Sequence, residues 1–216
     1  MLLTNKEIQN IPRLKRIHLM NAITGYKSAN LIGTIDELGV SNLGVFSSVT
    51  HIGSQPPIIG FILRPTTVPR NTYLNIKKTG FYTINSIGAD FYKRAHACTA
   101  KFDGAISEFE ACDLNEEFID GFLAPFVKES AIKIALEFKE EIHISVNNTI
   151  LILGQVIHID IPDKSIMTDG FVDIESLDLV TVSGLDAYYS PQILARLSYA
   201  RPNQKIEELP HFSAIE

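Results

Sequence analysis

The stretch IKIALEFKEEIHISVNNTILILGQVIHIDI, residues 132–161, carries the clearest structural pattern in this 216-residue chain. Apolar residues occupy every second position from 132 to 138, and the same phase resumes from 142 to 146. Such period-2 alternation predicts a long strand with one face in solvent. Asn147-Asn148 predicts a turn into a second apolar strand, in which Gly154 predicts a bulge. The stretch therefore predicts a long antiparallel hairpin.

Further strands precede this hairpin. Residues 29–35 and 40–49 are rich in apolar and β-branched side chains, and the turn between them, 36–39, ends in a glycine suited to positive φ. Pro56-Pro57 interrupts the chain before strand 58–64, which is apolar enough to be buried on both faces, and 81–85 predicts another strand. At least six strands without regular βαβ alternation predict a mainly β fold with inserted helices, an antiparallel barrel rather than a doubly wound sheet.

Short helices are predicted between and beside the strands. Residues 5–20 form an amphipathic segment, and Asn71-Thr72 predicts the cap of a helix that ends at Gly80. Helix-like spacing over 90–102, with Asp90 as N-cap, and the capping-box spacing of Ser107 to Glu110 predict two more. Residues 172–180 predict one or two helical turns. The tail from 184 to 202 is rich in Tyr and Arg without clear periodicity.

The composition restricts the class of protein. The chain is 45% hydrophobic with a net charge of −6, which argues against a nucleic-acid binder, whose affinity needs basic phosphate contacts. The N-terminus lacks the apolar core of a secretory signal, and no run of about 20 apolar residues predicts a membrane span. Two cysteines cannot form a disulfide framework. We expect a single domain over 1–216, with a core at about 20–190, in a soluble cytoplasmic protein.

Several catalytic and binding motifs are missing from the sequence. It has no G-x-G-x-x-G, no G-x-x-x-x-G-K-[ST] and no G-x-S-x-G, so neither nucleotide fingerprint nor a serine-hydrolase elbow is present. The six histidines show no metal-binding spacing. His143 and His158 lie across the predicted hairpin and could approach each other, but polar-face roles suit them better. We expect no metal site.

The stretch from Asn42 to Asn75, NLGVFSSVTHIGSQPPIIGFILRPTTVPRNTYLN, suggests an anion site. Hydroxyls and arginines flank two apolar runs within it, namely Ser47, Ser48, Thr50, Ser54, Arg64, Thr66, Thr67, Arg70 and Thr72. Guanidinium groups and hydroxyls hold phosphates well, and the N-terminus of the predicted helix also favours anions. Taken alone, such residues often only satisfy backbone groups at strand ends. The combination predicts a phosphate-type ligand, such as flavin mononucleotide, as readily as a structural role.

The order of these motifs resembles a known family. GYKSANLIGTID, then NLGVFSSVTHIGSQPP, then GFILRPTTVPRNTYLNIKKTGFYTIN is similar to the flavin reductase-like family with an FMN-binding split barrel. The similarity is greatest to the branch in which N-L-x-x-F-S-S precedes G-F-x-x-R-P and an R-x-T-x-x-N-I helix. It runs from about residue 20 to about 190, and the Tyr/Arg-rich tail departs from the commoner short ending.

The resemblance implies where a flavin would bind. The isoalloxazine ring would lie against the backbone of the segment that begins at Asn42, with main-chain hydrogen bonds from Val45, Phe46 and Ser47. The phosphate and ribityl chain would be held by Ser48, Thr50, Arg64, Thr67, Arg70 and Thr72, and less securely by Lys27 and Ser28. Asn85 and Ile87 would approach from another side. The family is usually a homodimer with the flavin near the interface. In the tail, Tyr188, Tyr189, Arg196 and Arg201 would belong to a substrate pocket or a dimer clasp.

The resemblance also implies an activity. Hydride from NADH or NADPH, bound transiently, would pass to N5 of FMN, with FAD as an alternative cofactor, and no catalytic side-chain acid or base is required. His51 could contact ring or substrate, although a structural role suits it better. The rival hypotheses are a flavin-binding carrier or sensor with little turnover and, as a weaker option, an oxidase of the pyridoxamine-phosphate type.

Overall fold

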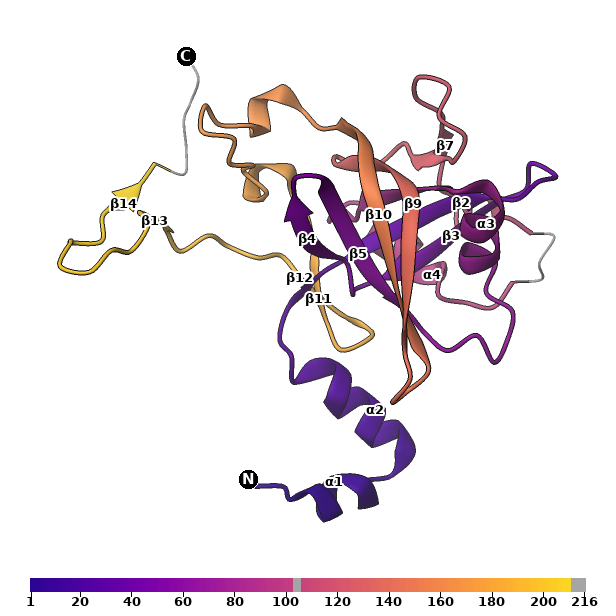
Figure 1. Cartoon of the computed structure of the whole chain (residues 1–216), viewed down its shortest axis with the longest axis horizontal. Helices are drawn as coiled ribbons and strands as arrows, with labels where there is room; N and C mark the ends of the chain where they lie inside the picture. Colours follow the sequence, from indigo (N-terminus) through magenta and orange to yellow (C-terminus); the bar gives the residue numbers. More distant parts are fainter. Residues whose placement is uncertain (103–105, 211–216) are drawn as a thin grey trace.

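The computed structural model describes residues 1–102 and 106–210. Its centre is one seven-stranded antiparallel sheet with the order β3-β2-β6-β9-β10-β5-β4 (Figure 1). The strands of this sheet are β2 (Asn30–Ile35), β3 (Ser41–Phe46), β4 (Thr50–Ser54), β5 (Pro57–Leu63), β6 (Phe81–Ser86), β9 (Lys133–Ile144) and β10 (Thr149–Asp160). The predicted strands and the mainly β fold class are confirmed, including Gly39 at φ 85° in the turn between β2 and β3.

The long hairpin β9–β10 forms as the alternation predicts. Its register shifts between Leu153 and Gly154, so the predicted bulge is confirmed. The side chain of Tyr82 occupies the space beside Gly154, and a Cβ there would lie 2.1 Å from its hydroxyl oxygen. In the observed register His143 pairs with Ile150 and His158 with Ala135, at opposite ends of the hairpin. The suggested approach of these histidines is therefore wrong.

The prediction that one face of β9 lies in solvent is confirmed only in part. Lys133 lies on it, yet its exposure is 8%. Its Nζ forms ion pairs with Glu117 at 2.6 Å and with Asp160 at 3.1 Å. The segment that carries Glu117 covers this end of the strand, which alternation within β9 alone could not reveal. Two carboxylates compensate for burial of the ammonium group.

The sheet is curled, because its two edge strands are consecutive in sequence. Only residues 47–49 separate β3 from β4, although these strands end opposite edges of the sheet. The hydroxyl of Ser48 accepts a hydrogen bond from the Ile62 N–H (3.0 Å) and donates one to its carbonyl (3.1 Å), tying this link to β5. No backbone ladder joins β3 to β4 within the described parts of the chain. The inner face packs a core of Ile32, Phe61, Leu63, Ile76, Tyr82, Ile84, Leu136, Ile150 and Ile152.

The helices differ in detail from the sequence predictions. They are α1 (Asn5–Asn10), α2 (Arg13–Ala22), α3 (Asn71–Thr79), α4 (Tyr92–Ala97) and α5 (Glu108–Ala111). The predicted helix 5–20 is interrupted by Pro12, and α1 and α2 extend away from the body in Figure 1. Gly80 ends α3 in the left-handed region at φ 78°, as predicted.

Three of the predicted caps can be compared with the structure. The N-cap of α3 is Arg70, without a side-chain hydrogen bond, rather than Asn71-Thr72. The N-cap of α4 is Phe91 rather than Asp90, because the chain turns one residue later. Ser107 is the N-cap of α5 as predicted, but it accepts from the Phe109 N–H rather than from that of Glu110, so the capping-box prediction is confirmed only for the cap residue.

Smaller sheets surround the main one. They are formed by β1 (Lys27–Ser28) with β11 (Thr181–Ser183) and β12 (Ala187–Tyr189), by β7 (Glu116–Glu117) with β8 (Phe126–Val127), and by β13 (Arg196–Leu197) with β14 (Glu208–Leu209). The 3-10 turns η1 (Asp163–Ser165) and η2 (Glu175–Leu177) connect β10 to β11, and η2 confirms one predicted helical turn. Over 1–102 and 106–210, no helix combines the length and apolarity needed to cross a bilayer.

Candidate functional site

Two arginines without acidic partners in the described chain flank the loop between β5 and α3. Arg64 follows β5 directly and is exposed, whereas Arg70 is the half-buried N-cap residue of the helix. Within the described chain neither guanidinium forms an ion pair, and Nε of Arg70 is buried without a hydrogen-bond partner. Thr67, between them, is exposed. Helix N-termini carry unsatisfied N–H groups and favour anions, so the N-terminal amides of α3 and the Arg70 guanidinium both supply positive potential at this end of the helix.

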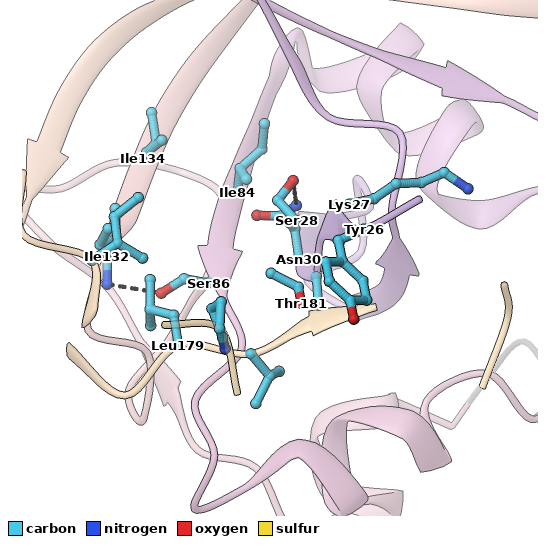
Figure 2. A pocket seen from close by; sticks show the side chains of 14 residues that line it. Tyr26, Lys27, Ser28, Asn30, Ile84, Ser86, Ile132, Ile134, Leu179 and Thr181 are labelled. Atoms are coloured by element: carbon cyan, nitrogen blue, oxygen red, sulfur yellow. Dashed lines mark hydrogen bonds between the residues drawn. The ribbon is translucent and has the colours of Figure 1, made fainter. Parts of the chain in front are cut away.

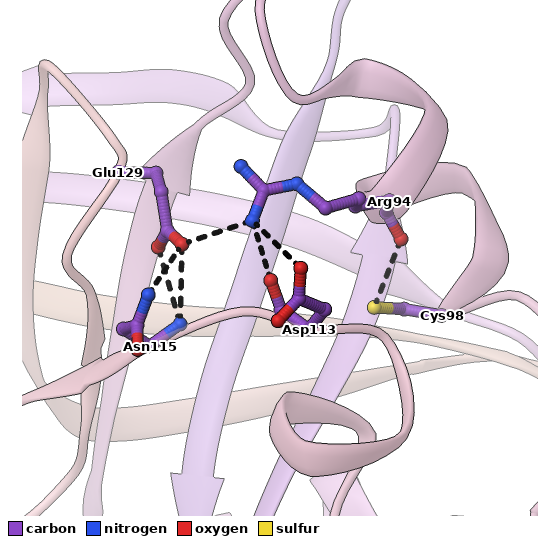
Figure 3. Close-up of polar contacts among 5 residues, drawn as sticks. All are labelled: Arg94, Cys98, Asp113, Asn115 and Glu129. Carbon is purple, nitrogen blue, oxygen red and sulfur yellow. Dashed lines mark hydrogen bonds and ion pairs between the residues drawn. The ribbon is translucent and has the colours of Figure 1, made fainter.

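Two other arginines, Arg94 and Arg196, form ion pairs, and Figure 3 shows the cluster around Arg94. Arg94 of α4 donates to the Asp113 carbonyl and forms ion pairs with Asp113 (3.8 Å) and Glu129 (3.3 Å). Glu129 also accepts from the backbone and side-chain amides of Asn115. The charged groups of this cluster bond to one another, and they connect α4 to the segment before β9, so the cluster stabilises the fold. Arg70 differs from the other arginines of the described chain in that its Nε is buried without a hydrogen-bond partner.

Asn42 and Thr72, both predicted to lie near a ligand, are buried beneath this end of α3. Their exposures are 8% and 7%, and the Asn42 amide donates to the Thr72 hydroxyl at 3.0 Å. Asn75, one turn further along α3, donates to Thr34 at 3.2 Å. The side chains thus fix the helix against β2 and β3, and this fixes the position of the helix N-terminus.

The outer edge of β3 offers backbone donors. β3 is an edge strand, and the Leu43 N–H points away from β2 to donate to Glu108 at 2.8 Å. Because backbone direction alternates along a strand, the Val45 N–H points to the same open edge. Burial raises the pKa of the Glu108 carboxyl. By the same alternation the backbone of Phe46, which pairs with Asn30, points to β2, and the chain continues through half-buried Ser47 to Thr50, which is exposed.

Other predicted residues have internal contacts. Asn85 is fully buried, donating to Leu31 and Thr83 and accepting from the Val127 N–H. Ile87 is also fully buried. The hydroxyl of Ser48 is already bonded to β5, and exposed His51 contacts Ser54 at 3.2 Å. The structure therefore does not bring the Asn85 side chain to the arginines.

A pocket of about 330 Å³ opens at one end of the curled sheet (Figure 2). Its lining residues come from β1, β2, β6, the start of β9 and the C-terminal segment, and they are Tyr26, Lys27, Ser28, Ala29, Asn30, Ile84, Ser86, Ile132, Ile134, Ile174, Leu179, Val180, Thr181 and Pro191. Lys27 and Ser28 were predicted; the others were missed, because no motif links segments so distant in sequence. Lys27 Nζ donates to the Asn21 carbonyl at 2.6 Å, and Ser28 accepts from Asn30 at 2.9 Å.

The four tail residues singled out in the sequence have different surroundings. Tyr188 contacts His96 at 3.1 Å, and burial raises the pKa of the Tyr188 hydroxyl. Tyr189 packs on Tyr26 with ring centres 4.7 Å apart. Arg196 pairs with Asp169 at 2.5 Å, whereas Arg201 is exposed. Across the described residues no three His, Cys, Asp or Glu side chains group together in a way that could hold a metal ion.

Comparison with known proteins identifies similar chains. The family model described as "Flavin reductase like domain" matches residues 26–173. A crystal structure from Shewanella frigidimarina NCIMB 400, assigned as a flavin reductase with split barrel domain, is 43% identical. The match covers 93% of this chain and 100% of that one, with a TM-score of 0.90.

Two more distant structures share the fold. Flavoredoxin of Desulfovibrio vulgaris (Miyazaki F) is 23% identical, with a TM-score of 0.68 over 79% of this chain and 90% of its own. An NADH:FAD oxidoreductase of Streptomyces globisporus C-1027 is 11% identical, with a TM-score of 0.66 over 89% of this chain and 98% of its own. At these identities the likeness concerns the fold alone.

Proposed function

The chain belongs to the flavin reductase like domain family, and from that premise we propose that it is an FMN-binding oxidoreductase that accepts hydride from NADH or NADPH. The family and the names of its structural neighbours support a flavin-linked oxidoreductase. The specific cofactor, FMN rather than FAD, and the nicotinamide donor are our inference. We further propose a split-barrel arrangement of the curled sheet, as in the 43% identical neighbour.

The observation that carries the proposal is the buried, unbonded Nε of Arg70 at the N-terminus of α3, with Arg64 at the other end of the same loop. Two cations without acidic partners, one of them with a buried and unbonded Nε, fit a phosphate monoester. FMN ends in such a group. We assign Arg64 and Arg70 to the phosphate, together with Thr67, Thr50 and the N-terminal amides of α3.

Buried residues would keep this site in place. Thr72 and Asn42 hold the helix N-terminus against the sheet, and Ser48 holds the β3–β4 link on β5. Their proposed contribution to cofactor binding is therefore largely to position the exposed groups. Lys27 and Ser28 would lie on the pocket side of the cofactor. The side chain of Asn85 would act through the sheet rather than by contact.

The open edge of β3 would receive the ring. A bound flavin supplies a two-electron centre that accepts hydride at N5. The outward N–H of Val45, with the backbone of Ser47, would hydrogen-bond the polar edge of the ring and orient it, whereas the Phe46 backbone faces β2. Donors fixed in a strand need no rearrangement when negative charge develops on the ring, which favours its reduced form.

The test begins with the absorption spectrum of the protein after incubation with FMN and removal of free flavin. Retained yellow-flavin bands support the cofactor, and a parallel incubation with FAD tests preference. Anaerobic stopped-flow mixing with NADH and NADPH then tests turnover. If neither donor bleaches the bound flavin within minutes, the reductase proposal is wrong and a carrier or sensor remains.

We also propose a cytoplasmic homodimer with the flavin near the subunit interface. Light scattering at several protein concentrations, with and without FMN, tests the assembly. A strictly monomeric holoprotein would contradict it.

A further inference from the structure

The two cysteines of the chain lie near each other at the ends of two neighbouring helices. Cys98 is the C-cap residue of α4 and Cys112 is that of α5, and both are free thiols with exposures of only 5%. The two side chains are close enough for the ionisation of each thiol to depend on the other. They are therefore a pair of reactive groups rather than two separate core residues.

Contacts on either side of the pair keep the two helix ends together. Arg94, one turn before Cys98 on the same face of α4, donates to the carbonyl of Asp113, the residue after Cys112 (Figure 3). The thiol of Cys98 itself lies 3.7 Å from the Arg94 carbonyl oxygen. Both cysteines and Phe109 of α5 belong to one buried apolar cluster. The fold thus presents the two sulfurs to each other from two elements that no covalent bond joins directly.

One of these elements, α5, covers part of the edge of β3. Glu108 accepts from the Leu43 N–H at 2.8 Å, and the hydroxyl of Ser107 lies 2.8 Å from that of Ser41. The covered part ends two residues before Val45, whose N–H points to the open edge. A bond between α4 and α5 would therefore also fix the cover of β3.

We propose that Cys98 and Cys112 form a reversible disulfide when the protein meets hydrogen peroxide. In the first step the Cys112 thiol loses its proton to solvent, and its sulfur attacks the O–O bond to give a sulfenic acid and hydroxide. In the second step the Cys98 sulfur attacks the sulfenic sulfur, the S–S bond forms and water leaves. The pair loses two electrons, and the peroxide is reduced to two waters. A dithiol reductant restores both thiols by thiol–disulfide exchange.

The surroundings of the pair determine the order of the two steps and make them slow. Burial raises the pKa of both thiols, and the Glu108 carboxylate acts in the same direction. The neighbouring Cys98 thiol lowers the pKa of Cys112, so Cys112 ionises more readily and reacts first. Because little thiolate is present at neutral pH, the disulfide records sustained rather than brief exposure to peroxide.

The test exposes the full chain, freed of reductant, to an excess of hydrogen peroxide. Digestion after blocking of free thiols with iodoacetamide should yield two peptides joined through Cys98 and Cys112, lighter by two hydrogens than the reduced pair. The closed ring spans 15 residues, and restriction of the unfolded chain by such a ring should raise the melting temperature by about 6–12 °C. Dithiothreitol should reverse both changes.

Two variants test the separate roles of the thiols. Cys98→Ala should stop at the sulfenic acid of Cys112, which dimedone captures, and its melting temperature should not rise with peroxide. Cys112→Ala should leave Cys98 as a free thiol under the same exposure. The melting temperature of each variant before oxidation shows whether it is folded, and the parent protein decides the inference if a variant is not.

Three results would overturn the inference. The first is a parent protein whose two thiols, after peroxide and denaturation, still react with iodoacetamide. The second is oxidation of either cysteine to a sulfinic acid without the joined peptides. The third is a disulfide that lowers the melting temperature, because the native fold would then not hold the sulfurs within bonding reach. None of these results depends on FMN binding or hydride transfer, so the inference and the proposed function are tested separately.

Discussion

Replacing Gly154 by alanine tests the packing of the curled sheet. An ideal Cβ at this bulge would lie 2.1 Å from Oη, 2.8 Å from Cζ and 3.0 Å from Cε1 of Tyr82. The ring cannot move aside easily, because Tyr82 is fully buried and packs edge-on against Phe61 at 5.7 Å. Either the hairpin or the ring must shift. We therefore expect Gly154→Ala to destabilise the fold.

The magnitude follows from the number of close contacts. Overpacking by one methyl typically costs about 1–3 kcal/mol, and three contacts at or below 3.0 Å place this site near the upper end, at about 3 kcal/mol. In a chain of this length such a loss lowers the melting temperature by about 6–12 °C. Elsewhere in a strand, Gly→Ala gains about 0.4–1 kcal/mol by restricting the unfolded chain, so the sign is diagnostic.

Urea unfolding of four proteins checks the argument: the parent, Gly154→Ala, Tyr82→Phe and the double variant. Tyr82→Phe alone should be close to neutral, because its hydroxyl is buried without a hydrogen-bond partner in the described chain. In that background Gly154→Ala should cost about half as much, since only the ring carbons still clash. Gly53→Ala, whose Cβ would meet nothing closer than 3.8 Å, is the control. A Gly154→Ala protein as stable as the parent would refute the reasoning.

Three further predictions concern charged groups. Arg64→Ala should weaken FMN binding by about 1.5–3 kcal/mol, or about 10- to 150-fold, whereas Arg201→Ala, at an exposed residue, should not. If Arg64→Ala binds FMN as tightly as the parent, the proposed position of the phosphate is wrong. Lys133→Met should cost about 1–3 kcal/mol in urea unfolding, because Glu117 and Asp160 lose their shared cation, and an unchanged midpoint would contradict this. Burial alone would raise the pKa of Glu141, but hydrogen bonds from Lys77, His143 and Tyr73 lower the pKa overall from its ordinary value of 4.5. The charged Glu141 carboxylate therefore stabilises the folded protein above pH 4.5, and this stabilisation is lost as the pH falls through the lowered pKa. The stability difference between the parent and Glu141→Gln should therefore shrink on acidification below pH 4.5, and a constant difference would contradict this.

Local chemistry made much of the fold predictable. Period-2 alternation identified β9, the Asn147-Asn148 turn and the Gly154 bulge, because each depends on residues near in sequence. Lys133 shows the limit of that reasoning. Its burial depends on a segment some 16 residues earlier, which supplies Glu117, and no periodicity within the strand encodes that cover. The predicted N-caps of α3 and α4 were wrong by one or two residues for a similar reason, since tertiary contacts decide between adjacent candidate residues.

The candidate site could be predicted from the sequence only where its residues lie close together along the chain. The arginines and hydroxyls of residues 42–75 are close in sequence, so their clustering could be read directly, although the structure was needed to separate exposed Arg64 from buried Thr72. The pocket could not be predicted from the sequence. Its polar group, Asn30, is one amide among many, and its walls come from five segments that only folding brings together.

The break between β3 and β4 explains why the proposed cofactor site lies where it does. A closed ladder would satisfy the outward N–H of Val45, as Glu108 satisfies that of Leu43. The curl instead brings the two edges together through the short link at Ser48, which leaves the end of β3 open beside the N-terminus of α3. In the proposed site, strand donors, the helix N-terminus and the two arginines would face one ligand, and none could satisfy another, since all are donors. An acceptor-rich anion would satisfy such a set of donors, which is why we propose that the interrupted edge of the sheet is the cofactor site.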